Sequence, residues 1–278
     1  MYKRNWSVYE KNCLLKHGFS LSNLQRFGDK PVEYITGSAQ FMGYDFAVSP
    51  DVLIPRLESE GIVSLAISFL GFRKNSKETD FVIADVGTGS GCIGISTFLK
   101  ATVDLGLNSK ILMSDISQKA IKIAEKNLRS LVIVKDCQNF SLFRSDLLAE
   151  YSCRKLDLIL ANLPYVPSAL LEKTDKSVVD HEPTIALDGG EDGLFLIRKL
   201  INQSRNFLST RGLIVLEVDQ RAIITAKSLG LEKSGLNFLV IKDQFKRQRY
   251  VLLGNYLDDE FKEFASVINS NYNQGYDQ

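Results

Sequence analysis

The chain has 278 residues, of which 45% are hydrophobic and 24% are charged. This composition is that of a globular protein of one or two domains, and it excludes wholesale disorder, collagen and coiled coil. With 34 basic and 33 acidic side chains, the formal net charge is +1. That balance argues against a protein that coats nucleic acid or a membrane surface by bulk electrostatics.

The cysteines and the N-terminal residues indicate the cellular compartment in which the protein is expected. The 4 cysteines are scattered, without a CxxC pair or a nearby pair of histidines, so we expect no metal site and no disulfide framework. The first residues are polar and lack the apolar core of a signal peptide, and the longest apolar run, 61–72, is too short to cross a bilayer. We therefore predict a cytoplasmic protein with reduced thiols.

The residues before 81 follow no single period. We expect one or two short helices within 8–27, a hairpin around Gly43 within 39–49, an apolar helix at 61–72 and a charged linker at 73–80. Residues 1–30 carry more basic than acidic side chains, whereas residues from 258 onward carry more acidic ones.

From residue 81 onward, short β-rich runs alternate with helical patterns. We predict strands at 81–85, 110–114, 140–144, 156–161, 213–218, 238–242 and 249–253, with helices such as 118–130 and 192–208 between them. This alternation is typical of βαβ units, so we expect a mainly parallel sheet that is covered on both faces. The last two runs lie only a few residues apart and are expected to pair antiparallel at one sheet edge.

A glycine-rich turn follows the first of these strands. In FVIADVGTGSGCIGI, residues 81–95, the strand ends at Asp85, and Gly87, Gly89 and Gly91 lead into a helix. Glycines let the backbone approach a ligand closely, and the helix start presents free N–H groups to it. A dinucleotide fold has the spacing G-x-G-x-x-G. The G-x-G-x-G spacing here, with an acid two residues before it, resembles the loop of S-adenosylmethionine-dependent methyltransferases. Taken alone, the motif also suits an ordinary glycine-rich turn.

Acidic residues follow the next two strands. Asp115 stands where a carboxylate can accept hydrogen bonds from ribose hydroxyls, a role that either class of nucleotide-like cofactor would use. Asp146 could accept a hydrogen bond from an adenine amino group, with Leu147 covering the base, or it could cap a helix. The sequence leaves both roles of Asp146 open.

The fourth strand ends in Asn162-Leu163-Pro164-Tyr165, which resembles the (N/D)PP(Y/F) motif of methyltransferases that act on planar amino nitrogens. An amide or aryl amino group is a poor nucleophile, because its lone pair is delocalised. The carbonyl oxygen of Asn162 and a neighbouring backbone carbonyl could hold both N–H bonds of such a group, while Tyr165 packs on its plane. Catalysis would then rest on positioning and electrostatics.

The tetrapeptide alone does not choose the substrate. Its letters also suit a β-turn, although its place at the end of a central strand favours function. NLPY occurs in the ribosomal RNA adenosine dimethyltransferases too, so a protein amide and a nucleic-acid base both remain open at this point.

Two further stretches extend the resemblance to most of the chain. Residues 31–60 contain P-x-x-Y-I-x-G, a hairpin and L-I-P-R-x-x-S-E, and residues 182–194 are EPTIALDGGEDGL. Together with the two motifs above, and in the same order, they resemble the HemK/PrmC family of glutamine N5-methyltransferases, which modify peptide chain release factors. The resemblance implies an α/β fold, that of a Rossmann-like class I S-adenosylmethionine-dependent methyltransferase with a seven-stranded, mostly parallel sheet. With the patterns at the two ends of the chain, we expect a short helical N-terminal segment and β-hairpin linker over 1–55, a catalytic domain over 56–256 and an acidic polar tail over 257–278.

The resemblance further implies a role for each matching residue. The cofactor S-adenosyl-L-methionine, which leaves as S-adenosyl-L-homocysteine, is expected to bind Gly87, Thr88, Gly89, Ser90, Gly91, Asp115, Asp146, Leu147 and Asn162. The catalytic residues are expected to be Asn162, Pro164 and Tyr165. The residues expected to bind the substrate are Asn162, Leu163, Pro164, Tyr165, Pro55 and Arg56.

Residues around this site have expected roles of their own. Arg56 is expected to close over the active site, and the alternative is a salt link to Glu60 at a helix start. Glu182 and Pro183 are expected to shape the loop beside the substrate, with His181 as a polar loop residue.

The chain departs from the family pattern in two places. Leu163 replaces the commoner second proline of the motif, which removes a φ restraint from the loop. Only residues 1–30 precede Pro31, where family members usually carry several helices that help to grip the release factor. The basic side chains of this front are therefore a candidate docking patch: Lys3, Arg4, Lys11 and Lys16.

We therefore expect methyl transfer to the N5 of a protein glutamine, in the GGQ motif of class I peptide chain release factors. We expect a monomer that acts in translation termination, without direct contact to nucleic acid or membrane.

The alternatives are a ribosomal-protein glutamine methyltransferase, a nucleic-acid adenine N6 methyltransferase and a non-catalytic S-adenosylmethionine-binding module. A nucleic-acid enzyme needs a basic, aromatic-lined path, for which residues 242–249 are the local candidate, although they also suit a solvated turn. The glycine spacing disfavours an oxidoreductase.

Overall fold

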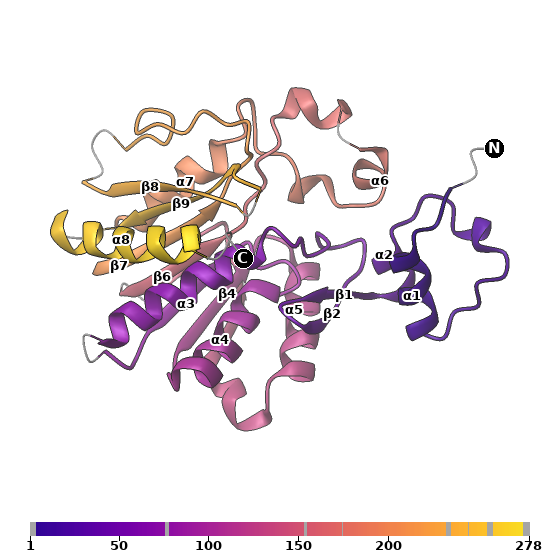
Figure 1. The fold of residues 1–278 in the computed structure, drawn as a ribbon, viewed down its shortest axis with the longest axis horizontal. Helices are drawn as coiled ribbons and strands as arrows, with labels where there is room; N and C mark the ends of the chain where they lie inside the picture. Colours follow the sequence, from indigo (N-terminus) through magenta and orange to yellow (C-terminus); the bar gives the residue numbers. More distant parts are fainter. Residues whose placement is uncertain are drawn as a thin grey trace.

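The computed structural model describes residues 4–75, 78–152, 155–173, 175–231, 235–243, 245–254 and 258–274. A seven-stranded sheet with helices on both faces forms the body, and a small N-terminal unit extends from one side of it (Figure 1). The expected α/β fold with a mostly parallel sheet is confirmed. Among the described residues, no helix combines the length and the apolar character that a membrane span requires.

The strand order of the sheet is β5-β4-β3-β6-β7-β9-β8. The strands are β3 (Val82–Val86), β4 (Lys110–Asp115), β5 (Phe140–Arg144), β6 (Leu156–Ala161), β7 (Leu208–Glu217), β8 (Asn237–Lys242) and β9 (Gln248–Gly254). Five neighbouring strands, from β5 to β7 in that order, run parallel, and β9 is antiparallel to both of its neighbours. The predicted antiparallel pairing of the last two strands is confirmed, with β8 at the edge. Strand β7 begins before its predicted start at 213, because Leu208 pairs with Leu156 ahead of a register shift.

The register brings the carboxyl ends of the central strands together. Asp85 of β3 lies opposite Met113 of β4 on one side and Leu160 of β6 on the other. Asp115 and Asn162, which come shortly after these partners in the chain, are therefore at the same edge of the sheet. The chain leaves β3 toward β4 on one side and later returns to β6 on the other. Open α/β sheets bind ligands at such a switch point.

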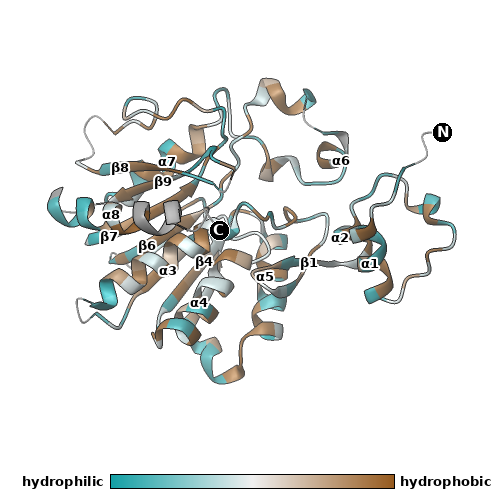
Figure 2. Ribbon diagram, in the orientation of Figure 1, coloured by the Kyte–Doolittle hydropathy of each residue, from teal (hydrophilic) through white to brown (hydrophobic). Residues whose placement is uncertain are grey.

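Alternate residues of the central strands face two separate hydrophobic cores. On one face, α3 (Glu60–Asn75), α4 (Cys92–Leu105), α5 (Gln118–Leu131) and α8 (Asp258–Gln274) cover residues such as Ile83 and Leu158. On the other face, α7 (Phe195–Ser204) covers Ala84 and Ile159. In Figure 2 the strands are mostly brown, and teal residues gather on the helices around them. The short helices η2 (Val134–Asn139), η3 (Ser168–Lys173), α6 (Lys176–Val179) and η4 (Thr184–Ala186) lie in the connections.

The predicted helices are found with adjusted ends. Helix α3 continues to Asn75 and buries Arg73, so the charged linker expected from 73 begins later. Helix α7 is shorter than the predicted 192–208. At its start Gly193 has a φ of 75°, and the Asp192 side chain accepts a hydrogen bond from the Leu194 N–H instead of lying within the helix.

The C-terminal segment differs from the polar tail expected over 257–278. Residues Asp258–Gln274 form helix α8, which buries Phe261, Phe264 and Ile268. The rings of Phe264 and Phe69 of α3 pack edge to face, with their centroids 5.5 Å apart. The spacing of the three buried residues places them on one helical face. The acidic residues between them make the segment look polar when only its composition is considered.

The N-terminal unit has a small core of its own. It comprises α1 (Val8–Lys16), the 3₁₀ helix η1 (Leu24–Phe27) and α2 (Val32–Thr36), packed around Trp6, Leu14 and Val32. The short helices expected within 8–27 are confirmed. Ser7 caps α1 with a hydrogen bond from the Glu10 N–H, and the Glu10 carboxylate accepts one from the Ser7 N–H in return.

The expected hairpin joins this unit to the body. Strands β1 (Ser38–Phe41) and β2 (Tyr44–Ala47) pair antiparallel and lead from the unit toward α5 (Figure 1). The turn residues Met42 and Gly43 have φ angles of 52° and 82°, as a two-residue hairpin turn requires. Phe41 and Phe46 belong to the main hydrophobic core, so the hairpin is anchored in the body.

Candidate active site

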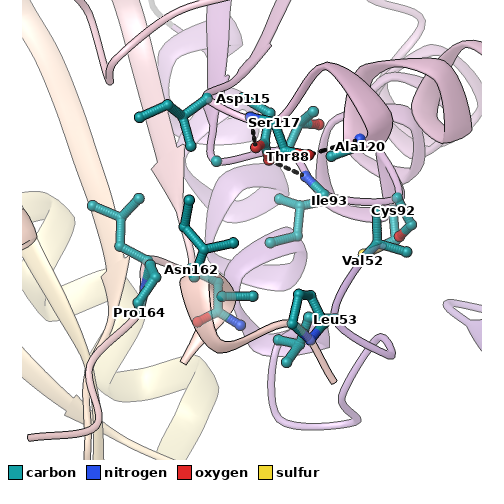
Figure 3. Close-up of a pocket in the computed structure, with 18 of the residues that line it drawn as sticks. Val52, Leu53, Thr88, Cys92, Ile93, Asp115, Ser117, Ala120, Asn162 and Pro164 are labelled. Carbon is teal, nitrogen blue, oxygen red and sulfur yellow. Dashed lines mark hydrogen bonds between the residues drawn. The ribbon is translucent and has the colours of Figure 1, made fainter. Parts of the chain in front are cut away.

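A cavity lies at the carboxyl ends of β3, β4 and β6 (Figure 3). It is lined by the glycine loop, the residues after β4, β5 and β6, and the segment that precedes α3. Of the residues predicted for the site, those that line the cavity are Pro55, Arg56, Gly87, Thr88, Gly89, Ser90, Asp115, Asp146, Leu147, Asn162, Leu163 and Pro164. Gly91 and Tyr165 lie beside the cavity without lining it.

Asp85 holds the glycine loop against the start of α4. Its Oδ2 atom accepts hydrogen bonds from the Thr88 hydroxyl at 2.5 Å and from the Gly94 N–H at 2.9 Å. A β-carbon on Gly94 would lie 2.8 Å from the same oxygen, so this close approach requires glycine. Burial raises the pKa of the Asp85 carboxyl to about 6, and its Oδ1 atom has no hydrogen-bond partner among the described residues.

The N–H groups of the loop are directed to protein acceptors. Gly87 and Thr88 both donate to the Ser114 carbonyl at 2.9 Å, and Gly89 donates to Asp115 Oδ2 at 2.9 Å. A pyrophosphate would need these N–H groups as hydrogen-bond donors, and the carboxylate of Asp115 would repel it. The loop therefore suits a ligand without phosphate groups.

Asp115 retains acceptor capacity toward the cavity. Its two oxygens accept from the N–H groups of Gly89 and Ser117, at 2.9 and 2.8 Å. An ionised carboxylate offers about four lone-pair sites, so further donors such as a pair of ribose hydroxyls can be accommodated. Burial raises the pKa of the Asp115 carboxyl.

Asp146 and Leu147 follow β5 at the side of the cavity. No helix begins after Asp146, where residues 147–150 form a turn, so the alternative that this residue caps a helix is wrong. Its carboxylate instead forms an ion pair with Lys199 of α7 at 2.5 Å. Leu147 is buried in the left-handed conformation, with a φ of 55°, and it lines the cavity wall.

The residues after β6 are tied to a buried carboxylate at the end of β7. The Asn162 Nδ2 atom donates to Ser59 Oγ at 2.8 Å, and Ser59 Oγ donates to Glu217 Oε2 at 2.8 Å. The Tyr165 hydroxyl donates to Glu217 Oε1 at 3.1 Å. Burial raises the pKa of the Tyr165 hydroxyl, so the phenol remains neutral.

The motif at 182–194 packs against the backbone of the same tetrapeptide. A β-carbon on Gly189 would lie 2.7 Å from the Tyr165 Cα atom, and one on Gly193 would lie 2.2 Å from the Tyr165 carbonyl oxygen. Val166 and Asp188 also form a β-bridge. These two glycines therefore let the loop support the residues that follow β6.

Arg56 pairs with Glu182 and not with Glu60. The Arg56 guanidinium forms an ion pair with the buried Glu182 carboxylate, which also accepts from the Ile54 N–H at 3.3 Å. Glu60 instead accepts from the Met42 N–H at 2.6 Å. The alternative of an Arg56–Glu60 salt link is therefore wrong, and the reason is that α3 begins only at Glu60.

The basic front is partly engaged in internal contacts. Arg4 forms an ion pair with Glu10 and donates to the carbonyl oxygens of Gly28 and Lys30. Lys16 pairs with Asp45 at 2.8 Å. Lys3 lies outside the described residues. Of the four residues of the candidate docking patch, Arg4 and Lys16 thus have structural partners.

Comparisons with known proteins give the family. The family described as methyltransferase small domain matches residues 72–180. The chain is 35% identical over 248 residues to the release factor glutamine methyltransferase of Borreliella burgdorferi, which covers 88% of this chain and 78% of that protein. It is 32% identical over 252 residues to the enzyme of the same name from Clostridium acetobutylicum, covering 90% of this chain and 82% of that protein. The chain belongs to the release factor glutamine methyltransferase family.

Solved structures agree on the fold of this family member. The human methyltransferase 10 domain containing protein superposes with a TM-score of 0.53 at 16% identity, covering 91% of this chain and 100% of that chain. The catalytic domain of human METTL16, crystallised with an RNA hairpin, gives a TM-score of 0.55 at 16% identity, covering 79% and 77%. At this identity the likeness establishes the methyltransferase fold alone.

Two polar residues of this methyltransferase have no predicted role from the sequence. Ser59 belongs to the L-I-P-R motif, and Glu217 is the last residue but one of the predicted strand 213–218, yet they meet only in the folded chain. An acid at the carboxyl end of a parallel strand is the feature that singles out Asp85 and Asp115. The same feature could have singled out Glu217.

Proposed function

We propose that this methyltransferase transfers a methyl group from S-adenosyl-L-methionine to the N5 of the glutamine in the GGQ motif of class I peptide chain release factors. The observation that carries the proposal is the placement of Asn162 in a cavity shared with the glycine loop and Asp115. Members of the family with this name, 30–36% identical to the chain, support the same substrate.

The residues around the cavity fit a methyl donor that carries a nucleoside and no phosphate. Asp115 would accept from the ribose hydroxyls, and Leu147 would cover the adenine. The loop from Gly87 to Gly91 would allow the amino-acid part of the donor to approach the backbone. The N–H groups of Gly87, Thr88 and Gly89 are satisfied by Ser114 and Asp115. When bound, S-adenosylmethionine supplies an activated methyl group on a sulfonium.

The substrate amide would be held by two acceptors. The Asn162 Nδ2 atom donates to Ser59, which leaves Oδ1 to accept from the substrate NH2 group. The backbone carbonyl of residue 163 would accept the second N–H. Leu163 is buried, and its Cδ2 atom lies 3.0 Å from where a β-carbon of Gly87 would be. This packing restrains the loop in place of the missing proline.

The chemistry rests on position and not on a strong base. The described residues that line the cavity include no histidine, and the Tyr165 phenol remains protonated because burial raises its pKa. Two acceptors on the amide N–H bonds favour lone-pair density on the nitrogen, which can then attack the methyl carbon in line with the bond that breaks. Pro55 and Arg56, held by Glu182, would exclude water from this point.

In the stretch 242–249 the side chains of Lys242, Phe245, Lys246 and Arg247 are exposed, whereas Asp243 and Arg249 are buried. Between β8 and β9, Asp243 accepts from the N–H groups of Phe245 and Arg247. Arg249, the last basic residue of the stretch, is buried and directed to Asp243.

The test is a methylation assay with competing substrates. The purified protein is incubated with S-adenosylmethionine and either a class I release factor, a ribosomal protein mixture or an adenine-containing oligonucleotide. We expect a methyl group on the GGQ glutamine of the release factor by mass spectrometry. Methyl transfer only to the ribosomal proteins or to adenine would assign the protein to one of the alternative functions.

A further inference from the structure

Glu217 is a buried acid behind the site rather than in it. It ends β7 with 1% of its surface exposed, and Ser59, its partner before α3, is 2% exposed. Its Oε2 atom accepts from the Ser59 hydroxyl at 2.8 Å and its Oε1 atom from the Tyr165 hydroxyl at 3.1 Å. Both donors come from segments that flank the cavity.

The carboxylate gives this chain of hydrogen bonds a direction. An ionised carboxylate only accepts hydrogen bonds, so the single hydroxyl proton of Ser59 must point to Glu217. The Ser59 oxygen can then only accept from Asn162, at the observed 2.8 Å. That bond must come from Nδ2, because Oδ1 has no proton to donate. The direction of these hydrogen bonds therefore decides that the Nδ2 atom of Asn162 faces Ser59 and that the Oδ1 atom is free.

The local chemistry favours a role for this charge. Glu217 itself has 1% of its surface exposed, and a carboxylate that is buried to this extent is destabilising unless it is paired. Burial raises the pKa of Glu217, and the hydrogen bond from Ser59 and the positive charge of Arg249 on β9 offset this in part. A well-packed apolar residue would serve the fold at least as well.

We propose that Ser59 and Glu217 are positioning residues that lock the side-chain amide of Asn162 with Oδ1 available to the substrate amide. The inference rests on the proposed function, in which Asn162 accepts a hydrogen bond from the reacting NH2 group. Ser59 lines the cavity but directs its proton to Glu217, and Glu217 does not line it. They act by excluding the flipped amide, which would present a donor to a donor.

Two substitutions separate this role from simple packing. In Glu217→Gln, the new amide can donate to Ser59, whose hydroxyl is then free to donate to Asn162 Oδ1, so the flipped orientation becomes accessible. In Ser59→Ala the link is cut, whereas Ser59→Thr keeps the hydroxyl. Glu78→Gln is the matched control: its carboxylate also accepts on both oxygens, from Arg73 and Arg211, but it does not belong to the hydrogen bonds that lead from Glu217 through Ser59 to Asn162.

The first readout is the division between kcat and donor binding. On a GGQ peptide, kcat should fall about 10- to 100-fold in Ser59→Ala and Glu217→Gln. The Kd of S-adenosylmethionine by calorimetry should stay within about threefold, and Ser59→Thr should recover most of the rate. Glu78→Gln should leave kcat unchanged. Wild-type kcat in both Ser59→Ala and Glu217→Gln would overturn the inference.

The second readout does not depend on turnover, and so distinguishes a failure of this inference from a failure of the proposed function. In a nitrogen-labelled sample, the side-chain NH2 signals of Asn162 are identified by their loss in Asn162→Asp. We expect slow hydrogen exchange of these protons in the wild type and in Ser59→Thr, and fast exchange in Ser59→Ala and Glu217→Gln. Equal exchange in all four proteins would overturn the inference even if the enzyme is active.

Discussion

The guanidinium of Arg56 is paired with the buried carboxylate of Glu182, which also accepts from the Ile54 N–H. Through this contact the segment before α3 is tied to the loop that supports the residues after β6. The same loop reaches the N-terminal unit, because the Nε2 atom of His181 lies 3.0 Å from Asp29 Oδ1. The adjacent residues 181 and 182 thus tie this loop to the N-terminal unit and to the segment before α3.

We expect Glu182→Ala to loosen the wall of the cavity. The change leaves the Ile54 N–H and the Arg56 guanidinium without their acceptor, and we expect a loss of about 1 to 3 kcal/mol in the free energy of unfolding. Because Pro55 and Arg56 line the cavity, the KM for the peptide should rise as well. Urea unfolding and initial rates measure the two effects.

The matched control is Glu125→Ala, which removes an exposed ion pair with Arg129 on α5 and should change neither quantity. An unchanged KM in Glu182→Ala would mean that the contact does not shape the site.

Asp115 is expected to govern donor affinity. Asp115→Ala removes the acceptor proposed for the ribose hydroxyls and leaves the Gly89 N–H without its partner. The Kd for S-adenosylmethionine should rise about 10- to 100-fold. Isothermal titration of wild type, Asp115→Ala and the exposed control Asp104→Ala on α4 gives the comparison. Equal affinities in all three would place the ribose elsewhere.

Asp85 should make stability depend on pH. Its pKa is raised by burial from the ordinary 3.8 to about 6, so the folded state binds this proton more tightly than the unfolded state does. The resulting stabilisation is present at low pH and is lost as the pH rises through about 6. Relative to Asp85→Asn, the wild type should lose about 2 kcal/mol of unfolding free energy between about pH 4 and pH 7.

The measurement is urea unfolding of both proteins across that range, without ligand. All other titrating groups are common to the two proteins, so the difference between the curves isolates Asp85. A difference that does not change with pH would show that the Asp85 carboxyl titrates normally.

The basic front separates into a structural and a solvent-facing part. Arg4→Glu would break its contacts with Glu10, Gly28 and Lys30 and should destabilise the N-terminal unit, seen as faster proteolysis there. Lys11 is exposed on α1, so Lys11→Glu should keep the fold. If this front docks the release factor, Lys11→Glu weakens methylation of the whole protein more than that of a free GGQ peptide. Equal effects on both would end the docking hypothesis.

The sequence predicts the sheet well, because each strand is a compact β-rich run, and several of the residues that line the cavity lie at or just after a strand end. Asp85, Asp115 and Asn162 can therefore be assigned to one edge of the sheet from the sequence alone. Contacts between segments that are far apart in the sequence cannot be assigned in this way. Ser59 and Glu217 are 158 positions apart, and Arg56 and Glu182 are 126 apart. For Arg56 the spacing favours the nearby Glu60 as partner, and only the actual start of α3 removes it.

The ends of the chain are harder to predict for another reason. In the sequence of α8, apolar residues alternate with acidic ones, so the composition suggests a polar tail. In the structure, Phe261 and Phe264 are buried against the body. For Arg4, the sign of the charge suggests a partner protein, whereas its guanidinium is used to hold Glu10 and the carbonyl of Lys30.

The most direct test of the whole account is the fragment mass spectrum of the GGQ peptide from a release factor, after incubation with S-adenosylmethionine and either the wild type or Asn162→Ala. We predict one methyl group on the side-chain amide of that glutamine with the wild type, and a rate lower by about 100-fold with Asn162→Ala. A glutamine that remains unmodified by a wild-type protein that binds the donor would contradict the account.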